Sequence, residues 1–152
     1  MMLSDLSLPS STLTGSTQTV SETGSEWVAQ DARGNGSGWS VTMAADGPFT
    51  SAAGVVETTP RTMAIGNLVL APGSVTAHPG SDSTANLAAT TITLSTSAQT
   101  FLACSSVCKG RYGFMPTLTL TVPANAYRSN YSNAVNSSPL NPYTATLVVT
   151  IS

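Results

Sequence analysis

Apolar and polar residues alternate with a period of two along much of this chain. In residues 117–122 three apolar side chains alternate with three threonines, and residues 39–45 and 144–152 follow the same pattern. Because successive side chains of a β-strand point to opposite faces, each run predicts a strand with one face in a core. We expect Trp39 and Leu147 to share one dry interior.

Glycine and proline separate these runs into short pieces, and no stretch has a helical period. Many short strands with turn signals between them are typical of two packed sheets. The sequence therefore predicts an all-β, two-sheet antiparallel β-sandwich, Ig-like or jelly-roll-like, that forms one domain over residues 1–152. Leu118, in the clearest run, is expected to face its interior.

Both tryptophans flank a glycine-rich segment, residues 33–38, with the sequence Arg-Gly-Asn-Gly-Ser-Gly. Glycine and asparagine adopt positive φ at little cost, so we predict that the chain reverses here into a hairpin. Trp39 shares a face with Val41 and is expected in the core. For Trp27 the pattern leaves two places open, the core or an exposed aromatic surface that binds a ligand.

Two shorter interruptions also carry predictions. Asp-Gly-Pro-Phe at residues 46–49 predicts a turn. Gly66-Asn67 breaks the alternation between Ile65 and Leu68, which predicts a bulge or register slip inside a strand pair.

The first 21 residues alternate only weakly and contain Pro9. Proline in such a run indicates an edge strand or an extended arm. We predict an N-terminal arm or donor strand whose apolar side chains pack on this chain or on a neighbouring subunit. These side chains are Leu3, Leu6, Leu8, Leu13 and Val20.

Residues 125–142 form a long polar segment rich in Asn, Ser, Tyr and Pro. Long loops in compact domains are more often functional or involved in assembly than idle. Tyrosine buries its ring while its hydroxyl stays in water. Tyr127, Tyr131 and Tyr143 are therefore candidate binding aromatics.

Charged residues make up only 8% of the chain, with a net charge of −2, while 41% of residues are hydrophobic. The five basic residues are scattered, so nucleic acid is an unexpected partner. No apolar run reaches the roughly 20 residues of a transmembrane segment. The hydroxyl-rich surface suits an extracellular or cell-surface protein, although no secretory leader is present in this sequence. Either a leader was removed, or the protein travels by another route, as a virion component would.

Cys104 and Cys108 are the only cysteines, and three residues separate them. A metal site needs more ligands, and a redox pair normally has two intervening residues. We predict a small disulfide that pins a loop, with two free thiols as the alternative.

Catalysis requires a nucleophile with a base, paired carboxylates or a metal cluster, and none is evident. His78 lies beside Ser81 and Asp82 in a loop, where an exposed histidine is favoured over a general base. Oxygens at Asp31, Asn35 and Ser37 are spaced as in a calcium loop, but no glutamate closes it. A turn in which Asp31 accepts amides or pairs with Arg33 is favoured. We predict no catalytic residue, no metal and no cofactor.

Three asparagines fit the Asn-x-Ser pattern of N-glycosylation, namely Asn35, Asn130 and Asn136. Chance produces many such matches in a chain this rich in asparagine and serine.

Three parts of the chain, taken together, carry a family likeness. They are residues 31–34 with 38–42, residues 112–113 with 116–124, and residues 143–151. In content and order they resemble the WxL domain family of Gram-positive cell-surface proteins. The chain has Leu147-Val148-Val149 where that family has its distal Trp-x-Leu. The resemblance implies an extracellular, non-catalytic domain that attaches to the cell wall or assembles with other surface proteins.

From these observations we expect a secreted, non-enzymatic structural or adhesive protein of the cell surface. Its exposed strand edges and N-terminal arm favour self-assembly into a filament by strand addition, with copies of itself or other surface proteins as partners. One alternative is a module that binds peptidoglycan of the cell wall or another glycan. A second alternative is a virion or tail decoration protein.

Overall fold

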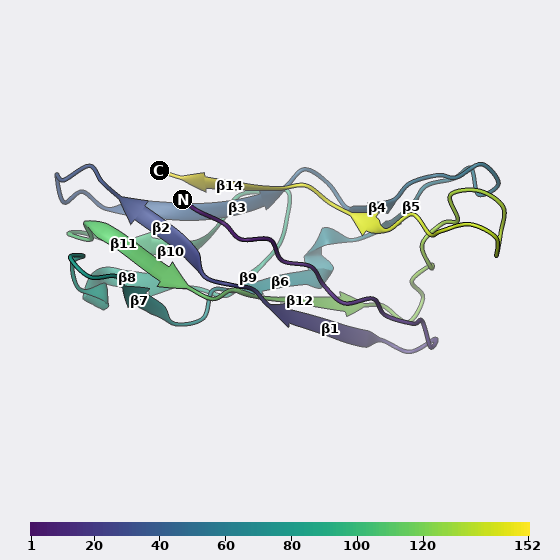
Figure 1. Ribbon diagram of the computed structural model, residues 1–152, viewed down its shortest axis with the longest axis horizontal. Helices are drawn as coiled ribbons and strands as arrows, with labels where there is room; N and C mark the ends of the chain where they lie inside the picture. Colours follow the sequence, from purple (N-terminus) through teal and green to yellow (C-terminus); the bar gives the residue numbers. More distant parts are fainter.

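The computed structural model describes all 152 residues and contains strands and two short 3-10 turns. No helix in it is long and apolar enough to cross a membrane. In chain order the elements are β1 (Gln18–Thr23), β2 (Trp27–Asp31), β3 (Trp39–Ala45), β4 (Phe49–Ser51), β5 (Arg61–Met63), η1 (Ile65–Asn67), β6 (Leu68–Ala71), β7 (Val75–Ala77), η2 (Thr84–Asn86), β8 (Leu87–Ala89), β9 (Ile92–Thr93), β10 (Gln99–Cys104), β11 (Gly110–Phe114), β12 (Thr117–Val122), β13 (Tyr143–Thr144) and β14 (Leu147–Ile151). They build an elongated molecule (Figure 1).

The first layer is organised around β11 and β12, which follow one another in the chain. β12 pairs antiparallel with β1 on one side and β6 on the other. β11 pairs in the same way with β2 and β7. β9 extends this layer at the edge of β6. The layer is therefore a long antiparallel ribbon in two successive parts.

The register of this ribbon shifts by one residue where β11 meets β12. Three residues, 24–26, separate β1 from β2, whereas only two, 115 and 116, separate β11 from β12. Pro116 has no N–H to donate to the ladder. Its carbonyl oxygen still accepts a hydrogen bond from the Gly24 amide at 2.8 Å. Proline thus divides the ribbon while one hydrogen bond bridges the gap.

The second layer has the strand order β14-β3-β10-β8, and β13-β4-β5 forms its extension. β3 is followed by β4 and β13 by β14, so two neighbouring strands run from one sheet into the other. All neighbours are antiparallel. The register of β10 against β3 shifts between Thr100 and Leu102, where a bulge lies.

Aromatic rings from both layers meet in one core. Phe101 of the second layer and Phe114 of the first have ring centroids 6.1 Å apart, and Trp39 lies 6.0 Å from Tyr112. All four side chains are buried. The predicted all-β sandwich is confirmed. Leu118 and Leu147 also face this core, and Leu147 is partly buried.

The predicted hairpin between the two tryptophans is wrong. β2 pairs with β11 in the first layer, whereas β3 pairs with β10 and β14 in the second. The glycine-rich segment therefore crosses between layers. Arg33 stabilises the crossing, because its guanidinium donates to the carbonyl oxygens of Ser37 and Gly38. β2 and β3 both bury side chains, but their backbone hydrogen bonds go to different strands.

At the turn predicted for residues 46–49, residues 46–48 form a bend between β3 and β4, which are not paired with each other. The prediction at Gly66 needs correction. The interruption at Gly66 is a 3-10 turn, η1, and not a bulge within one strand pair. It lies between β5 in one sheet and β6 in another, so the chain changes layer there.

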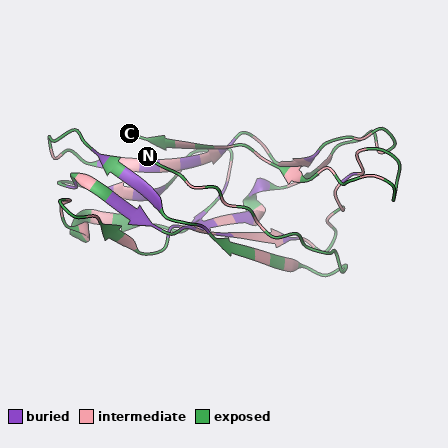
Figure 2. Cartoon of the chain, in the orientation of Figure 1, coloured by how far each residue is buried: buried purple, intermediate pink, exposed green.

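Burial differs along the molecule (Figure 2). We call the part that contains β2, β3, β10 and β11 the proximal end, and its strands carry many buried residues. We call the loops at residues 52–60 and 123–142, with β4, β5 and β13, the distal end. Most residues of these loops are exposed or intermediate.

Candidate functional site

Residues 1–17, which we call the N-terminal arm, run back along β1 and β2 of their own chain (Figure 1). Met2 and Val28 exchange two main-chain hydrogen bonds of 2.8 and 2.9 Å. These are the arm's only main-chain to main-chain hydrogen bonds. The Trp27 indole N–H also donates to the carbonyl oxygen of Ser4 at 3.1 Å. The arm is thus fixed to the first layer near its beginning.

Side chains seat the arm more extensively than its backbone does. Leu6 and Leu8 pack against the core cluster, together with Met1. Gly24 makes room for Leu6, because a Cβ atom there would lie 2.7 Å from Leu6 Cδ1. In contrast, Leu3 is 50% exposed. Of these predicted arm residues, Leu6 and Leu8 are therefore seated on their own chain and Leu3 is not.

The remaining predicted arm residues lie apart from this seat. Leu13 is 37% exposed and lies in a stretch that makes no backbone hydrogen bond. Val20 belongs to β1 and lies opposite Leu120 of β12. β1 therefore fills the edge of the first layer from within the same chain.

Trp27 is not an exposed binding aromatic. It is 6% exposed, and its ring meets Phe114 edge-on with centroids 6.1 Å apart. Its inward place follows from the register, since Trp27 lies opposite Phe114 and both point into the core. Only the indole N–H is engaged by the arm.

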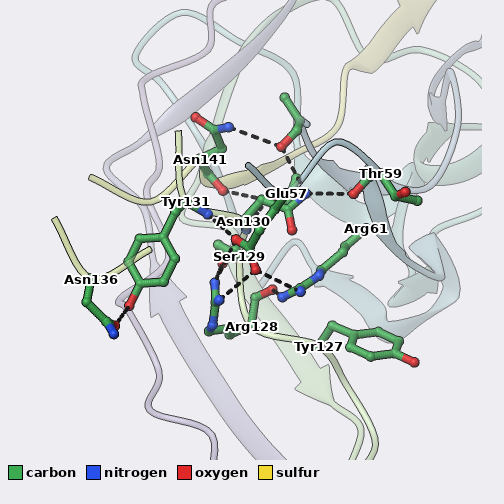
Figure 3. Close-up of polar contacts among 12 residues, drawn as sticks. Glu57, Thr59, Arg61, Tyr127, Arg128, Ser129, Asn130, Tyr131, Asn136 and Asn141 are labelled. Carbon is green, nitrogen blue, oxygen red and sulfur yellow. Dashed lines mark hydrogen bonds and ion pairs between the residues drawn. The ribbon is translucent and has the colours of Figure 1, made fainter. Parts of the chain in front are cut away.

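The distal end holds a charged cluster around Glu57 (Figure 3). Glu57 Oε1 accepts hydrogen bonds from Arg61 at 3.0 Å and from Arg128 at 2.6 Å. Glu57 Oε2 accepts from Arg128 at 3.1 Å and from the Tyr131 amide at 2.5 Å. One carboxylate therefore joins the loop at residues 52–60 to the loop at residues 123–142.

Electrostatics follow from this geometry. Hydrogen bonds from Arg128, then from the Tyr131 amide, hold the pKa of Glu57 below its usual range. The carboxylate in turn raises the pKa of Arg128. The cluster contains two cations and one anion, so it keeps one net positive charge.

Asn130 lies beneath this cluster and is fully buried. Its amide group donates to the carbonyl oxygens of Ala52 and Thr59 at 3.1 and 2.9 Å. Its backbone N–H donates to Ser51 Oγ, which donates to Asn141 O. Asn130 is therefore not a glycosylation site in the folded protein, because its nitrogen is enclosed and engaged. Asn35 and Asn136 are exposed.

The three late tyrosines gather at the distal end but differ in their surroundings. Tyr127 is 67% exposed, with the Arg61 guanidinium 5.4 Å from its ring centroid. Tyr131 stacks with Arg128 at 4.2 Å, and its hydroxyl donates to Asn136. The hydroxyl of Tyr143 donates to Tyr127 O, and burial raises the pKa of Tyr143. Tyr127 alone presents a largely open ring.

A cleft of about 550 Å³ lies beside Tyr127. It is lined by residues 56–62, Tyr127 and Asn130. Sequence reasoning marked the tyrosines but missed Glu57 and Arg61. No signal could have found them, since Glu57 is 71 positions from Arg128 and the contact depends on the fold.

Residues considered for chemistry at the proximal end are occupied by structural contacts. Asp31 Oδ1 accepts from the backbone and side-chain nitrogens of Arg33, and the side-chain hydrogen bond leads in lowering the pKa of Asp31. Asn35 Oδ1 accepts from the Ser37 amide. These oxygens form a turn. Cys104 and Cys108 are joined in a disulfide.

His78 does not meet its neighbours in sequence. Its Nε2 lies 3.2 Å from Glu26 Oε1, and the two side chains meet over Gly113, where a Cβ atom would clash with both. Ser81 donates to Arg111 O, and Asp82 accepts from the Lys109 amide. The three side chains therefore form no triad, and each holds a different loop contact.

No family model matches this sequence, and neither a curated protein nor a solved structure matches it. The likeness to WxL domains remains a prediction from the sequence.

Proposed function

We propose that this protein is a non-enzymatic structural protein of the extracellular surface, and that its copies join by exchanging N-terminal arms. The observation that carries this proposal is how the arm is held. Two main-chain hydrogen bonds at Met2 and a few apolar side chains fix it to its own chain. A second copy offers the same seat, so an arm can leave one molecule and make identical contacts in another.

The connector between seat and sheet favours exchange. Residues 9–17 are all exposed, and Gly15 has a φ of +78°. Nine residues in extended form span about 30 Å, enough to reach a neighbour. If each arm enters the next molecule in a head-to-tail sense, the assembly does not close and a filament grows.

The outer surface is compatible with close association of copies. Across β1 and β12, Ser21 faces Thr119 at 3.0 Å and Thr23 faces Thr117 at 2.8 Å, in hydroxyl pairs without charge. Few charges mean little repulsion between stacked subunits. A disulfide is typical of oxidising, extracellular surroundings. An adhesive role on the surface is part of the same proposal.

The test compares assembly of the full chain with that of two point variants. Concentrated protein is examined by multi-angle light scattering and negative-stain electron microscopy. We expect concentration-dependent filaments from the full chain and none from Leu6→Asp, which cannot bury a charge in the seat. Leu3→Asp is the matched control, since Leu3 is 50% exposed, and it should assemble as the parent does.

Deletion of residues 1–17 gives an independent measurement. The truncated protein should remain monomeric and should bind a synthetic peptide of residues 1–17, reported by Trp27 fluorescence, because Trp27 N–H contacts Ser4. Filaments that persist after deletion, or a full chain that stays monomeric at every concentration, would overturn the proposal.

A further inference from the structure

The distal cleft combines unpaired hydroxyl groups with an exposed aromatic ring. Thr58, Thr59 and Thr62 line it and are exposed, and their hydroxyls make no hydrogen bond within the chain. Each hydroxyl can both donate and accept, as sugar hydroxyls do. Tyr127 forms one wall, and its exposed ring offers an apolar face for the C–H groups of a pyranose.

Arg61 adds a positive charge with free donors. Only two of its five N–H groups are bound, one to Arg128 O and one to Glu57 Oε1. Glu57 has no free acceptor site for hydrogen-bond donors of a ligand, because each of its oxygens already accepts two hydrogen bonds from the chain. The remaining donors of Arg61 therefore favour an anionic group, and carboxylate matches the planar guanidinium.

Asn130 lines the cleft but offers it no accessible polar atom of its side chain. Asn130 is fully buried, and its Oδ1 has no hydrogen-bond partner. Its Nδ2 is committed to two carbonyl oxygens, which fixes the direction of this acceptor. Because this oxygen has no access to solvent, a ligand in the cleft does not reach it, and Asn130 serves to hold the loop at residues 52–60 in place.

We propose that this cleft binds a saccharide that carries a carboxylate, with a sugar ring against Tyr127 and the carboxylate on Arg61. The threonine hydroxyls exchange hydrogen bonds with the sugar. A cleft of about 550 Å³ has the size of sites for small ligands. This site does not depend on the N-terminal arm, so it stands or fails separately from assembly.

The probes are trigalacturonate and maltotriose, two α-linked trisaccharides of similar size with and without carboxylates, and sodium acetate. Binding is followed by amide chemical shifts in 15N-labelled full-length protein, which also locate the site. We expect trigalacturonate to perturb residues 56–62 and 127–131. The affinity for maltotriose should be lower by at least about tenfold. Acetate at the same concentration should not perturb these residues.

Variants then separate the two contacts. Tyr127→Ala leaves every Glu57 hydrogen bond in place and should weaken trigalacturonate binding about tenfold. Arg61→Gln should weaken trigalacturonate to the level of maltotriose. Arg111→Gln removes an exposed charge outside the cleft and should change affinity less than about twofold.

Each contrary result overturns the proposal. Equal binding of the two trisaccharides would show that the carboxylate is not recognised. Equal perturbation by acetate would show that the cleft binds simple anions and not a saccharide. Unchanged affinity in Tyr127→Ala, or no binding of any probe, removes the saccharide site. Thermal unfolding of each variant, compared with the parent, verifies that the protein measured is folded.

Discussion

The proximal and distal ends of this molecule are held together by different forces. At the proximal end, Trp39, Phe101, Tyr112 and Phe114 lie in a dry core between the layers. At the distal end the loops expose their apolar residues, such as Val55 at 73%. Their order comes from Glu57 and Asn130 and the hydrogen bonds these make.

The chain can therefore vary its distal surface without losing its fold. Hydrophobic packing resists change, because a core side chain touches many others. A polar network depends on a few directed contacts and responds to pH and single substitutions. The proposed sugar site lies on the polar network, and the proposed arm seat lies on the packed core.

The largest effect is expected from Phe114→Ala. Removal of a buried phenyl ring costs roughly 3–5 kcal/mol, because the cavity collapses only in part. Urea unfolding followed by fluorescence measures the loss. The distal control is Val56→Ala, with Val56 57% exposed, and its effect should stay within about 0.5 kcal/mol. Equal losses in the two variants would contradict the division between the ends.

Removal of the disulfide should come second. Cys104 and Cys108 close a short loop at the proximal end, and the chain-entropy model gives about 2 kcal/mol for a loop of this length. The double variant Cys104→Ala/Cys108→Ala should therefore unfold at lower urea, with distal amide exchange unchanged. A loss as large as that of Phe114→Ala would show that the bridge, and not the core, dominates this end.

Glu57→Gln should act locally at the distal end. Two arginines lose their shared anion, and the Tyr131 amide loses a charged acceptor. Hydrogen exchange of amides in residues 123–142 should speed up, while amides of β3 and β10 keep their protection. Faster exchange throughout the protein would show instead that Glu57 contributes to the free energy of global unfolding.

Acidification should reproduce this effect reversibly. The folded-state pKa of Glu57 lies below the usual value, so its contribution is full above the ordinary glutamate range and is lost as pH falls through the lowered pKa. The protection factors of distal amides, which correct for the slower intrinsic exchange in acid, should therefore fall on acidification in the parent but not in Glu57→Gln. Asp31, whose pKa is also lowered, gives a separate proximal response in both proteins.

The smallest effect is expected from His78→Ala. The pair between His78 and Glu26 is partly exposed on both sides, and such pairs contribute at most about 1 kcal/mol. Thermal unfolding should hardly change. Any measured turnover that this variant abolishes would contradict a non-enzymatic protein.

The strands themselves could be predicted from the sequence, but not their partners. Alternation in residues 117–122 marks β12 and its buried face, because a two-residue period is a local property. The pairing of β2 with β11 joins residues 79 or more positions apart, and no local signal encodes it. A glycine-rich segment allows a reversal within one sheet or a crossing between sheets, which is why the hairpin prediction failed.

Of the two candidate sites, the arm could be predicted from the local sequence, whereas the distal cluster depends on the fold. Apolar residues of the arm stood out because Leu6 and Leu8 interrupt a polar stretch. The distal cluster did not, since Glu57 and Arg61 are ordinary in sequence and gain meaning only where Arg128 reaches them. A buried asparagine such as Asn130 is equally invisible until its partners are placed.

Both ends of the chain border β2. Met2 bonds to Val28, while Ser152 lies with Gln30 and Asp31 around a small hollow. Mechanical load applied through the two ends therefore meets the molecule at one place. We expect such a pull to break the two hydrogen bonds between Met2 and Val28 and to unzip β14 from β3, whereas a pull between the ends and the distal loops loads whole ladders in shear. The direction of force, more than the number of bonds, sets how this protein yields.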